Sequence, residues 1–248
     1  MTQAAMRYVA VVIPAHNEAG HIAACLAAVQ QAAHRATSLK YRVTTYVVCD
    51  ACTDRTAEIV ETAGGTALIV HARNVGAARA VGASVALDAG ADWLAFTDAD
   101  TLVAEDWLVA QLATQRELDC DAVCGTVAVE DWSMHTDAVR SEFANGYQDS
   151  DGHRHIHGAN LGISADAYRR AGGFAMLTSS EDVAMVEALE RAGATIAWSA
   201  APRVVTSARV EHRAPKGFGA TLIAAAERLR SLAITEPTDI NPTPVSFQ

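Results

Sequence analysis

The segment FTDADTLV, residues 96–103, places two acidic residues one position apart, directly after a hydrophobic run. If the backbone there is extended, Asp98 and Asp100 point to the same side, so both carboxylates can reach one cation or its water shell. Hard divalent cations that hold a diphosphate bind oxygen ligands in this way and keep several waters. A structural role is the alternative, because either aspartate could instead cap a helix that begins near residue 104.

A second pair of acids, Glu181 and Asp182, lies at the start of a predicted helix over residues 180–194. Ser179 or Ser180 is placed to be the N-cap of this helix. The helix dipole favours negative charge in the first turn, so these acids have a structural explanation of their own. On this evidence alone, the pair does not require a chemical role.

The composition limits the classes of protein to which the chain can belong. Of its 248 residues, 50% are hydrophobic and 19% are charged, which predicts a sizeable core. The net charge of −10, without a basic block, argues against a nucleic-acid partner. No apolar run approaches the ~20 residues of a membrane span, and the first residues do not resemble a signal peptide. With an odd number of cysteines, five, we expect a cytoplasmic protein.

The cysteines include two closely spaced pairs, Cys49 with Cys52 and Cys120 with Cys124. Either a zinc site or a redox pair could use such spacing. Neither pair lies in the sequence context typical of these sites. The favoured interpretation is therefore that they are buried or loop thiols.

The first half of the chain alternates strand-like and helix-like segments. The patterns predict strands at 8–14, 42–50, 66–72 and 92–100, and helices at 18–34, about 55–63, 75–89 and 104–118. Such alternation predicts an α/β fold, with a mostly parallel, twisted sheet covered by helices on both faces. A polar cluster follows each strand: PAHNE, CDACTDRT, HARNVGAAR and TDADT. Since ligands bind at the carboxyl ends of such strands, we expect these clusters to converge on one edge.

The second half is less regular. The patterns predict a strand within 122–131, a strand leading into a short helix over 157–174, two short strands around Pro202, and a last helix over 218–233. We predict a single domain over 1–234, with halves of about 7–118 and 119–234, followed by a flexible tail over 235–248. Gly172 and Gly173 are expected to end the short helix as a C-terminal cap.

Several common nucleotide sites are absent from the sequence. There is no G-x-G-x-x-G after the first strand, no G-x-x-x-x-G-K-[ST] and no G-x-S-x-G. Instead, five ordered motifs, VVIPAHNE, VVCDACTDRT, NVGAARAVGA, FTDAD and SSED, resemble those of the family 2 nucleotide-sugar glycosyltransferases of the GT-A fold. The resemblance covers roughly residues 7–215. It implies transfer of a sugar from a nucleoside-diphosphate sugar, UDP- or GDP-linked, to a hydroxyl acceptor, with inversion and with Mn2+ or Mg2+ as cofactor.

The resemblance assigns the donor side of the site to matching positions in this chain. These positions are Pro14, Ala15, His16, Glu18, Asp50, Arg79, Asp98 and Ala99. Asp50 and the PAHNE residues would hold the base and ribose, and Asp98 the sugar or ribose. The second motif departs from the family pattern D-D-G-S-T-D at Cys49, Ala51 and Cys52, which leaves the choice of base open. A residue on the helix surface is the alternative for Arg79.

The resemblance also assigns the chemistry. Asp182, with Glu181 beside it, matches the catalytic base that accepts the proton of the acceptor hydroxyl. Asp100 would bind the divalent cation. His212, from a loop with Gly217 and Gly219 that could close over the donor, would be a further ligand. The alternative for His212 is a solvated basic loop.

Small residues before the strand in 157–174 correspond to the acceptor side in the family: Gly158, Ala159 and Asn160. The nearby His153, His155 and His157 are predicted to be loop-surface residues rather than ligands. Neither the acceptor nor the oligomeric state follows from the sequence. A retaining enzyme of the same fold, a nucleotidyltransferase and a non-catalytic nucleotide-sugar binder are the competing functions. The basic glycine-rich loop of a nucleotidyltransferase is missing after the first strand.

Overall fold

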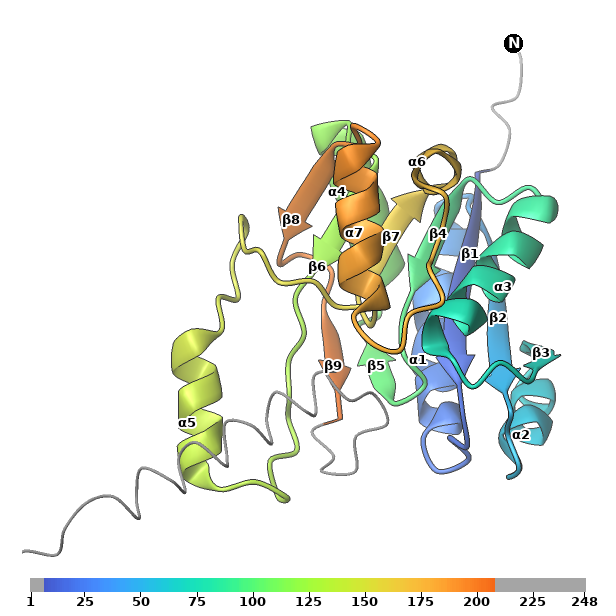
Figure 1. The fold of residues 1–248 in the computed structure, drawn as a ribbon, viewed down its shortest axis with the longest axis horizontal. Coiled ribbons are helices and arrows are strands. Elements are labelled where there is room, and N and C mark those ends of the chain that lie inside the picture. The colour runs from blue at the N-terminus through green and yellow to red at the C-terminus, as the bar shows by residue number, and fades with distance from the viewer. Residues whose placement is uncertain (1–6, 208–248) are drawn as a thin grey trace, which may run out of the picture. The chain divides into compact units, whose positions relative to one another are not determined.

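The computed structural model describes residues 7–207, which form an α/β fold (Figure 1). The strands are β1 Tyr8–Ala15, β2 Arg42–Asp50, β3 Thr66–Val70, β4 Trp93–Phe96, β5 Thr101–Val103, β6 Ala122–Gly125, β7 Leu161–Ser164, β8 Ile196–Ser199 and β9 Val204–Thr206. The helices are α1 Ile22–Ser38, α2 Thr56–Thr62, α3 Val75–Asp88, α4 Trp107–Leu118, α5 Asp137–Gly146, α6 Ala165–Ala171 and α7 Glu181–Arg191.

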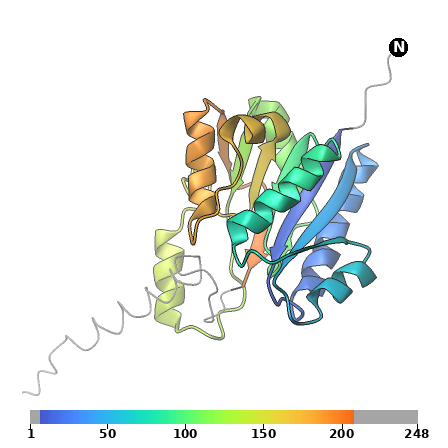
Figure 2. The same ribbon diagram turned by 45° about the vertical axis from the view of Figure 1, so that its right-hand side comes forward.

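One seven-stranded sheet has the order β3-β2-β1-β4-β7-β6-β8. Its strands are parallel except β7, which is antiparallel to both neighbours, β4 and β6. Helices α3, α6 and α7 cover one face, and α1 and α4 cover the other (Figures 1 and 2). A separate antiparallel pair joins β5 to β9. The predicted sheet, mostly parallel and covered on both faces, is confirmed.

Strand β1 lies inside the sheet and is covered by helices on both faces, so every position of the strand has to be apolar. All eight residues are buried, as expected of a central parallel strand with both faces covered. Helix α3 packs closely on β1 and β2 at Gly82. A Cβ atom there would lie 2.5 Å from Val12 and 2.9 Å from Val48. The glycine thus lets the helix that carries Arg79 approach the sheet.

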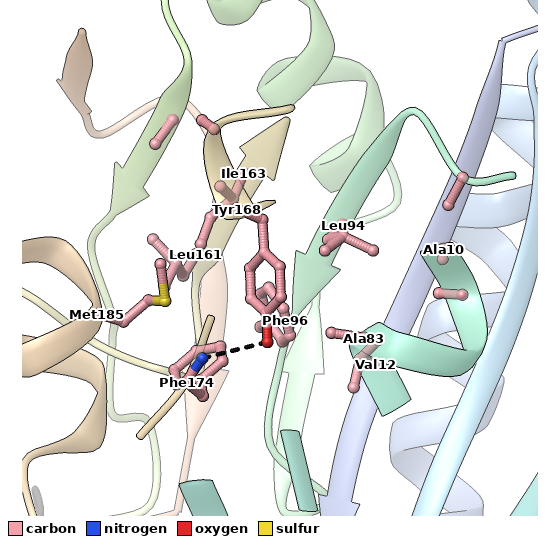
Figure 3. Packing of buried hydrophobic residues seen from close by; sticks show 14 of the residues in the cluster. Ala10, Val12, Ala83, Leu94, Phe96, Leu161, Ile163, Tyr168, Phe174 and Met185 are labelled. Atoms are coloured by element: carbon pink, nitrogen blue, oxygen red, sulfur yellow. Dashed lines mark hydrogen bonds between the residues drawn. The ribbon is translucent and has the colours of Figure 1, made fainter. Parts of the chain in front are cut away.

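An aromatic cluster joins the two halves of the sheet (Figure 3). The Phe96 ring, at the end of β4, meets Phe174 edge to face with ring centroids 4.9 Å apart. Tyr168 of α6 stacks on Phe96 at 6.2 Å, and its hydroxyl accepts the backbone N–H of Phe174 at 3.2 Å. Met185 of α7 belongs to the same core. These contacts fix the start of the loop that leads from α6 to α7.

The segment containing the two aspartates differs from the prediction. β4 ends at Phe96, and the backbone then makes a turn closed by a 3.1 Å hydrogen bond from the Thr101 N–H to the Asp98 carbonyl. The expectation of an extended strand through Asp100 is therefore wrong. Capping is also wrong, because α4 begins only at Trp107, with Asp106 as its N-cap.

Other boundaries moved less. β2 matches its predicted range, and α3 ends one residue early. α1 begins at Ile22 rather than residue 18, because the Glu18 carbonyl first accepts the N–H groups of His21 and Ile22 in a turn. Gly172 caps α6 with φ of 85°, as predicted.

Residues 132–147 belong to a separate compact unit that contains α5, a helix the sequence did not predict. Within it, Thr136 caps the helix by accepting the Val139 N–H, and the rings of Phe143 and Tyr147 stack at 4.8 Å. The predicted helix over 218–233, the loop with Gly217 and Gly219, and the tail lie outside the described residues. In the part of the chain that is described, no helix has both the length and the apolar character to cross a membrane.

Candidate functional site

The polar clusters after the first three strands meet, as predicted, at the carboxyl edge of the sheet. The side-chain oxygen of Asn17, after β1, accepts the Thr53 N–H at 2.7 Å. His16 Nδ1 lies 2.6 Å from the Asp50 carbonyl; since a carbonyl can only accept, this nitrogen carries the proton. Asn17, Ala51 and Arg73, which follow β1, β2 and β3, all have positive φ of 49–52°. Left-handed backbone at non-glycine residues concentrates at functional sites.

Asp50 is buried at the end of β2 and organises the loop after β3. Its Oδ1 accepts the N–H groups of Ala72 and Arg73 at 2.7 and 2.8 Å, and its Oδ2 accepts that of Asn74 at 2.7 Å. Three backbone donors satisfy a buried carboxylate well. The carboxylate that the resemblance assigns to the base and ribose is thus used to shape the loop after β3.

The PAHNE segment is tied to the next loop through Glu18, which is buried. The Glu18 N–H donates to Thr56 Oγ1 at 2.8 Å, and its carboxylate pairs with His21 at 3.1 Å. Asp54 accepts the N–H groups of Thr56 and Ala19, both at 3.0 Å. Desolvation acts in the opposite direction, but the hydrogen bond from the Thr56 hydroxyl, together with these two N–H groups, lowers the pKa of Asp54. The expected capping of the next helix is thus made by Asp54, which precedes the N-cap Arg55.

Arg79 lies at the centre of the site, and the helix-surface alternative is wrong because only 3% of its side chain is exposed. Its Nη2 donates to Asp98 Oδ1 at 2.6 Å, and its Nη1 forms an ion pair with Glu181. Burial opposes the charge of Arg79, but Asp98 and Glu181 more than offset this and raise its pKa. The guanidinium therefore joins the turn after β4 to the first turn of α7.

The space around this guanidinium is closely filled. A Cβ atom on Gly158 would overlap with Nη2 of Arg79, and the Phe174 ring lies 5.7 Å from the guanidinium carbon. Nε of Arg79 is buried without a hydrogen-bond partner among residues 7–207. Burial raises the pKa of Glu181, and Arg79 opposes the rise. We conclude that the two Nη groups of Arg79 both serve to position carboxylates, those of Asp98 and Glu181.

Asp182 is placed differently from its neighbour Glu181. It is partly exposed, and its Oδ2 accepts the Gly158 N–H at 2.9 Å while its Oδ1 accepts the Val183 N–H at 2.9 Å. Ser180 is the N-cap of α7, but it has φ of 59° and its side chain makes no capping hydrogen bond. The predicted N-cap position is therefore confirmed at Ser180, although its side chain does not bond to the first N–H groups of the helix.

The segment predicted to face the acceptor is held in place by Asn160, which is fully buried. Its Nδ2 donates to the carbonyls of Thr126 at 2.8 Å and Pro202 at 2.9 Å, and its Oδ1 accepts the Trp107 Nε1–H at 2.9 Å. Both N–H groups of the amide are thus used within the chain. Ala159 beside it is buried too, which leaves Gly158 as the position that borders Asp182.

The three histidines form a stacked column instead of the expected loop surface. His153 is fully buried; its Nδ1 accepts the His155 N–H at 3.2 Å, so its Nε2 donates to the Ser199 carbonyl at 3.4 Å. Neighbouring ring centroids lie 5.6 and 6.1 Å apart. Burial lowers the pKa of His157 to about 4, although Asp182 opposes the shift. An imidazole that stays neutral therefore lies near Asp182.

The turn that holds Asp98 and Asp100 is strongly negative. The Cys25 thiol of α1 donates to the Asp98 carbonyl at 3.4 Å. Burial first, and then the charges of Asp100 and Asp98, raise the pKa of this thiol to about 12. Oxygen donors in a negative field suit a hard divalent cation. No cluster of three or more acidic, histidine or cysteine ligands is assembled within residues 7–207, and the five cysteines are free thiols. His212 lies outside that range.

Solved structures with the same fold include nucleotide-sugar enzymes. Staphylococcus aureus TarS in complex with UDP-GlcNAc has a TM-score of 0.61 and 17% identity, covering 94% of this chain and 68% of that one. In the structure of TarS in complex with UDP, the match covers 61% of the TarS chain, so the present chain spans less than two thirds of that length. A mannosyltransferase from Pyrobaculum calidifontis in complex with GDP-Man and Mn2+ has a TM-score of 0.60 and 20% identity, and the match covers 93% of this chain and 65% of the mannosyltransferase.

A third structure is glucosyl-3-phosphoglycerate synthase from Mycobacterium tuberculosis with Mn2+, UDP and glucosyl-3-phosphoglycerate, with a TM-score of 0.58 and 16% identity over 94% and 82% of the two chains. At such identities the likeness establishes the fold, which is GT-A as predicted. No curated protein matches the sequence. The model of glycosyl transferase family 2, however, matches residues 10–172, well over half of the chain. The chain therefore belongs to glycosyl transferase family 2, as its motifs indicated.

Proposed function

We propose that this protein transfers a sugar from a nucleoside-diphosphate sugar to a hydroxyl acceptor, with inversion at the anomeric carbon. One observation carries the proposal. Arg79 forms ion pairs with Asp98, in the turn after β4, and with Glu181, in the first turn of α7. These contacts bring Asp182 to the same edge of the sheet as Asp98 and Asp100. Asp182 is partly exposed there and oriented by the Gly158 N–H.

In the proposed reaction, Asp182 accepts the proton of the acceptor hydroxyl. The hydroxyl oxygen forms a bond to the anomeric carbon, and the bond to the diphosphate oxygen breaks with its electron pair leaving on the diphosphate. Attack opposite to the leaving group inverts the configuration. When bound, a divalent cation such as Mn2+ or Mg2+ would neutralise the charge of the diphosphate. Asp100 would hold it, with His212 as a further proposed ligand, while Asp98 is proposed to contact the sugar or ribose of the donor.

The donor side is proposed to use the loops after β1, β2 and β3. Pro14, Ala15 and His16 lie in or directly after β1, where the ordered contacts to Asp50 give the base and ribose a preformed edge. Ala99 lies in the turn between the two aspartates. The similar structures include complexes with UDP, UDP-GlcNAc and GDP-Man, which supports a UDP- or GDP-linked sugar as the donor.

The first experiment measures thermal stability with UDP, GDP, CDP, ADP and TDP, each with and without Mn2+. A ligand at about 100 times its Kd stabilises the folded state by ~2.7 kcal/mol, which is a clear rise in Tm. We expect one nucleotide to stabilise the protein only when Mn2+ is present, and Asp100→Ala to abolish that shift.

Glu117→Ala, which removes an exposed acid of α4, is the matched control and should keep the full shift. A shift that survives Asp100→Ala would remove this residue from the metal site. No response of the folded wild-type protein to any nucleotide would overturn the donor site. With the donor known, NMR of the product decides the stereochemistry: retention of the anomeric configuration would contradict the proposed single attack.

A further inference from the structure

Asn74 links the donor-side loop after β3 to the loop that precedes Asp182. Its N–H donates to Asp50 Oδ2 at 2.7 Å, and its side-chain oxygen caps α3 by accepting the Ala77 N–H at 2.8 Å. The remaining side-chain group, Nδ2, donates to the Leu177 carbonyl at 2.8 Å. One residue thus fixes a helix start, a buried carboxylate and a distant loop together.

The loop over residues 174–180 has few other means of support beyond its first residue. Met176 is 72% exposed and Leu177 is 40% exposed, so burial of apolar side chains does little to hold this part of the loop. Its backbone nevertheless lies directly on α3, because a Cβ atom on Gly76 would overlap with the Ala175 carbonyl. The hydrogen bond from Asn74 is made in this close contact, at the point where the loop is otherwise solvent-facing.

We propose that Asn74 is a positioning residue for the reaction: its side-chain amide holds loop 174–180 against α3 and thereby sets the direction of Asp182. Leu177 lies five residues before Asp182, and between them Ser180 has a left-handed backbone that aims the first turn of α7. Because the N–H of Asn74 also binds Asp50, this residue would connect the loop after β3, on the donor side, to the catalytic base Asp182. It rests on the proposed function, in which Asp182 accepts the proton.

The test uses Asn74→Ser in the full chain, since serine is as good an N-cap as asparagine but is too short to reach the Leu177 carbonyl. Hydrogen–deuterium exchange of the amides of residues 174–180 should rise about fivefold, the effect of one lost hydrogen bond, while α3 stays protected. The rate of nucleoside-diphosphate release from the donor identified above, with water as acceptor, should fall about tenfold or more because the base is misplaced. The Kd of the nucleoside diphosphate should stay within about twofold, because the donor loop keeps its contacts to Asp50.

Gln30→Ala is the matched control, because Gln30 Nε2 makes the same type of bond, to the Ala63 carbonyl at 2.5 Å, away from this site. It should leave both the exchange of residues 174–180 and the release rate unchanged. Unchanged exchange of that loop in Asn74→Ser would overturn the proposal, and so would an unchanged release rate or a loss of donor affinity that explains the whole effect. The exchange readout needs no turnover, so it tests the contact between Asn74 and loop 174–180 even in a wild-type protein that releases no nucleotide to water, whereas the proposed function is tested separately by nucleotide binding.

Discussion

Two regions of the site each offer a pair of acids, and in each pair one acid forms an ion pair with Arg79. In the turn after β4, that acid is Asp98; Asp100 lies two residues further along, and both are partly exposed. In the first turn of α7, Glu181 binds Arg79 and Asp182 is partly exposed. One acid of each motif thus holds the architecture together. The comparison suggests that the chemistry belongs to the other.

The physical reason lies in the cost of burying a guanidinium. A buried charge is tolerated when opposite charges and hydrogen bonds compensate for the lost hydration, and Arg79 has two carboxylates for this. The compensating acids come from segments far apart in the chain. The ion pairs therefore fix the distance between the two motifs, which is the quantity that a transfer reaction needs.

The largest expected effect comes from removing this shared cation. Arg79→Met should lower the free energy of unfolding by about 3–5 kcal/mol, because it leaves Glu181 buried without its partner. Urea denaturation measures the change. The double variant Arg79→Met/Glu181→Gln should recover part of the loss, since it removes the unpaired charge as well. A loss below ~1 kcal/mol in the single variant would contradict this comparison, because the ion pairs of Arg79 with Asp98 and Glu181 would then contribute little to stability.

The next effect separates the two acids of α7. Asp182→Asn should reduce sugar transfer ~10²-fold or more, because an amide cannot accept the proton, and should lower the free energy of unfolding by only about 1 kcal/mol, because the amide keeps one of the two backbone hydrogen bonds. The matched variant Glu181→Gln should instead lower stability more while keeping more of the transfer rate. Steady-state kinetics and urea denaturation of both variants provide the readout. If Asp182→Asn transfers sugar at the native rate, or if both variants show the same changes in rate and stability, the two acids do not have separate catalytic and structural roles.

The smallest effect concerns the surroundings of Asp182. With a pKa lowered from 6.5 to about 4 by burial, His157 stays neutral in the folded protein while the unfolded chain binds a proton below pH 6.5. The folded state therefore has its full stability above pH 6.5 and loses stability progressively as the pH falls towards 4. His157→Gln should flatten the dependence of Tm on pH in this window. A wild-type Tm that stays constant between pH 6.5 and 4 would contradict the shift.

Local pattern was sufficient for much of the fold. The run RVTTYVVCD predicted β2 with its observed ends, and the polar clusters met at the predicted edge. The turn after β4 was missed because an alternating D-A-D is also what an extended segment looks like. The paired role of Arg79 could not be predicted, because its partners lie 19 and 102 residues away in the chain.

Two further features of the sequence, at Asn74 and at the three histidines, carried signals that could have been used. Asn74 stands three residues before Ala77, the spacing of an N-cap, which identifies the helix start but not the bond to Leu177. Histidines at every second position, 153, 155 and 157, indicate an extended segment whose rings share one side. The burial of that column depends on Trp198 and Ser199, which lie more than forty residues later in the chain.

The antiparallel strand β7 has a consequence for how the protein is made. Because β7 lies between β4 and β6, the neighbour that borders β4 on that side is translated after β5, α4 and β6. A ribosome that has released β1 to β4 has already made Asp98 and Asp100, yet Gly158 and Asp182 are still to come. We therefore expect a nascent chain to acquire the edge proposed to face the nucleotide first and the proposed catalytic base, Asp182, last. Translation that stops before α7 would yield a polypeptide without this residue.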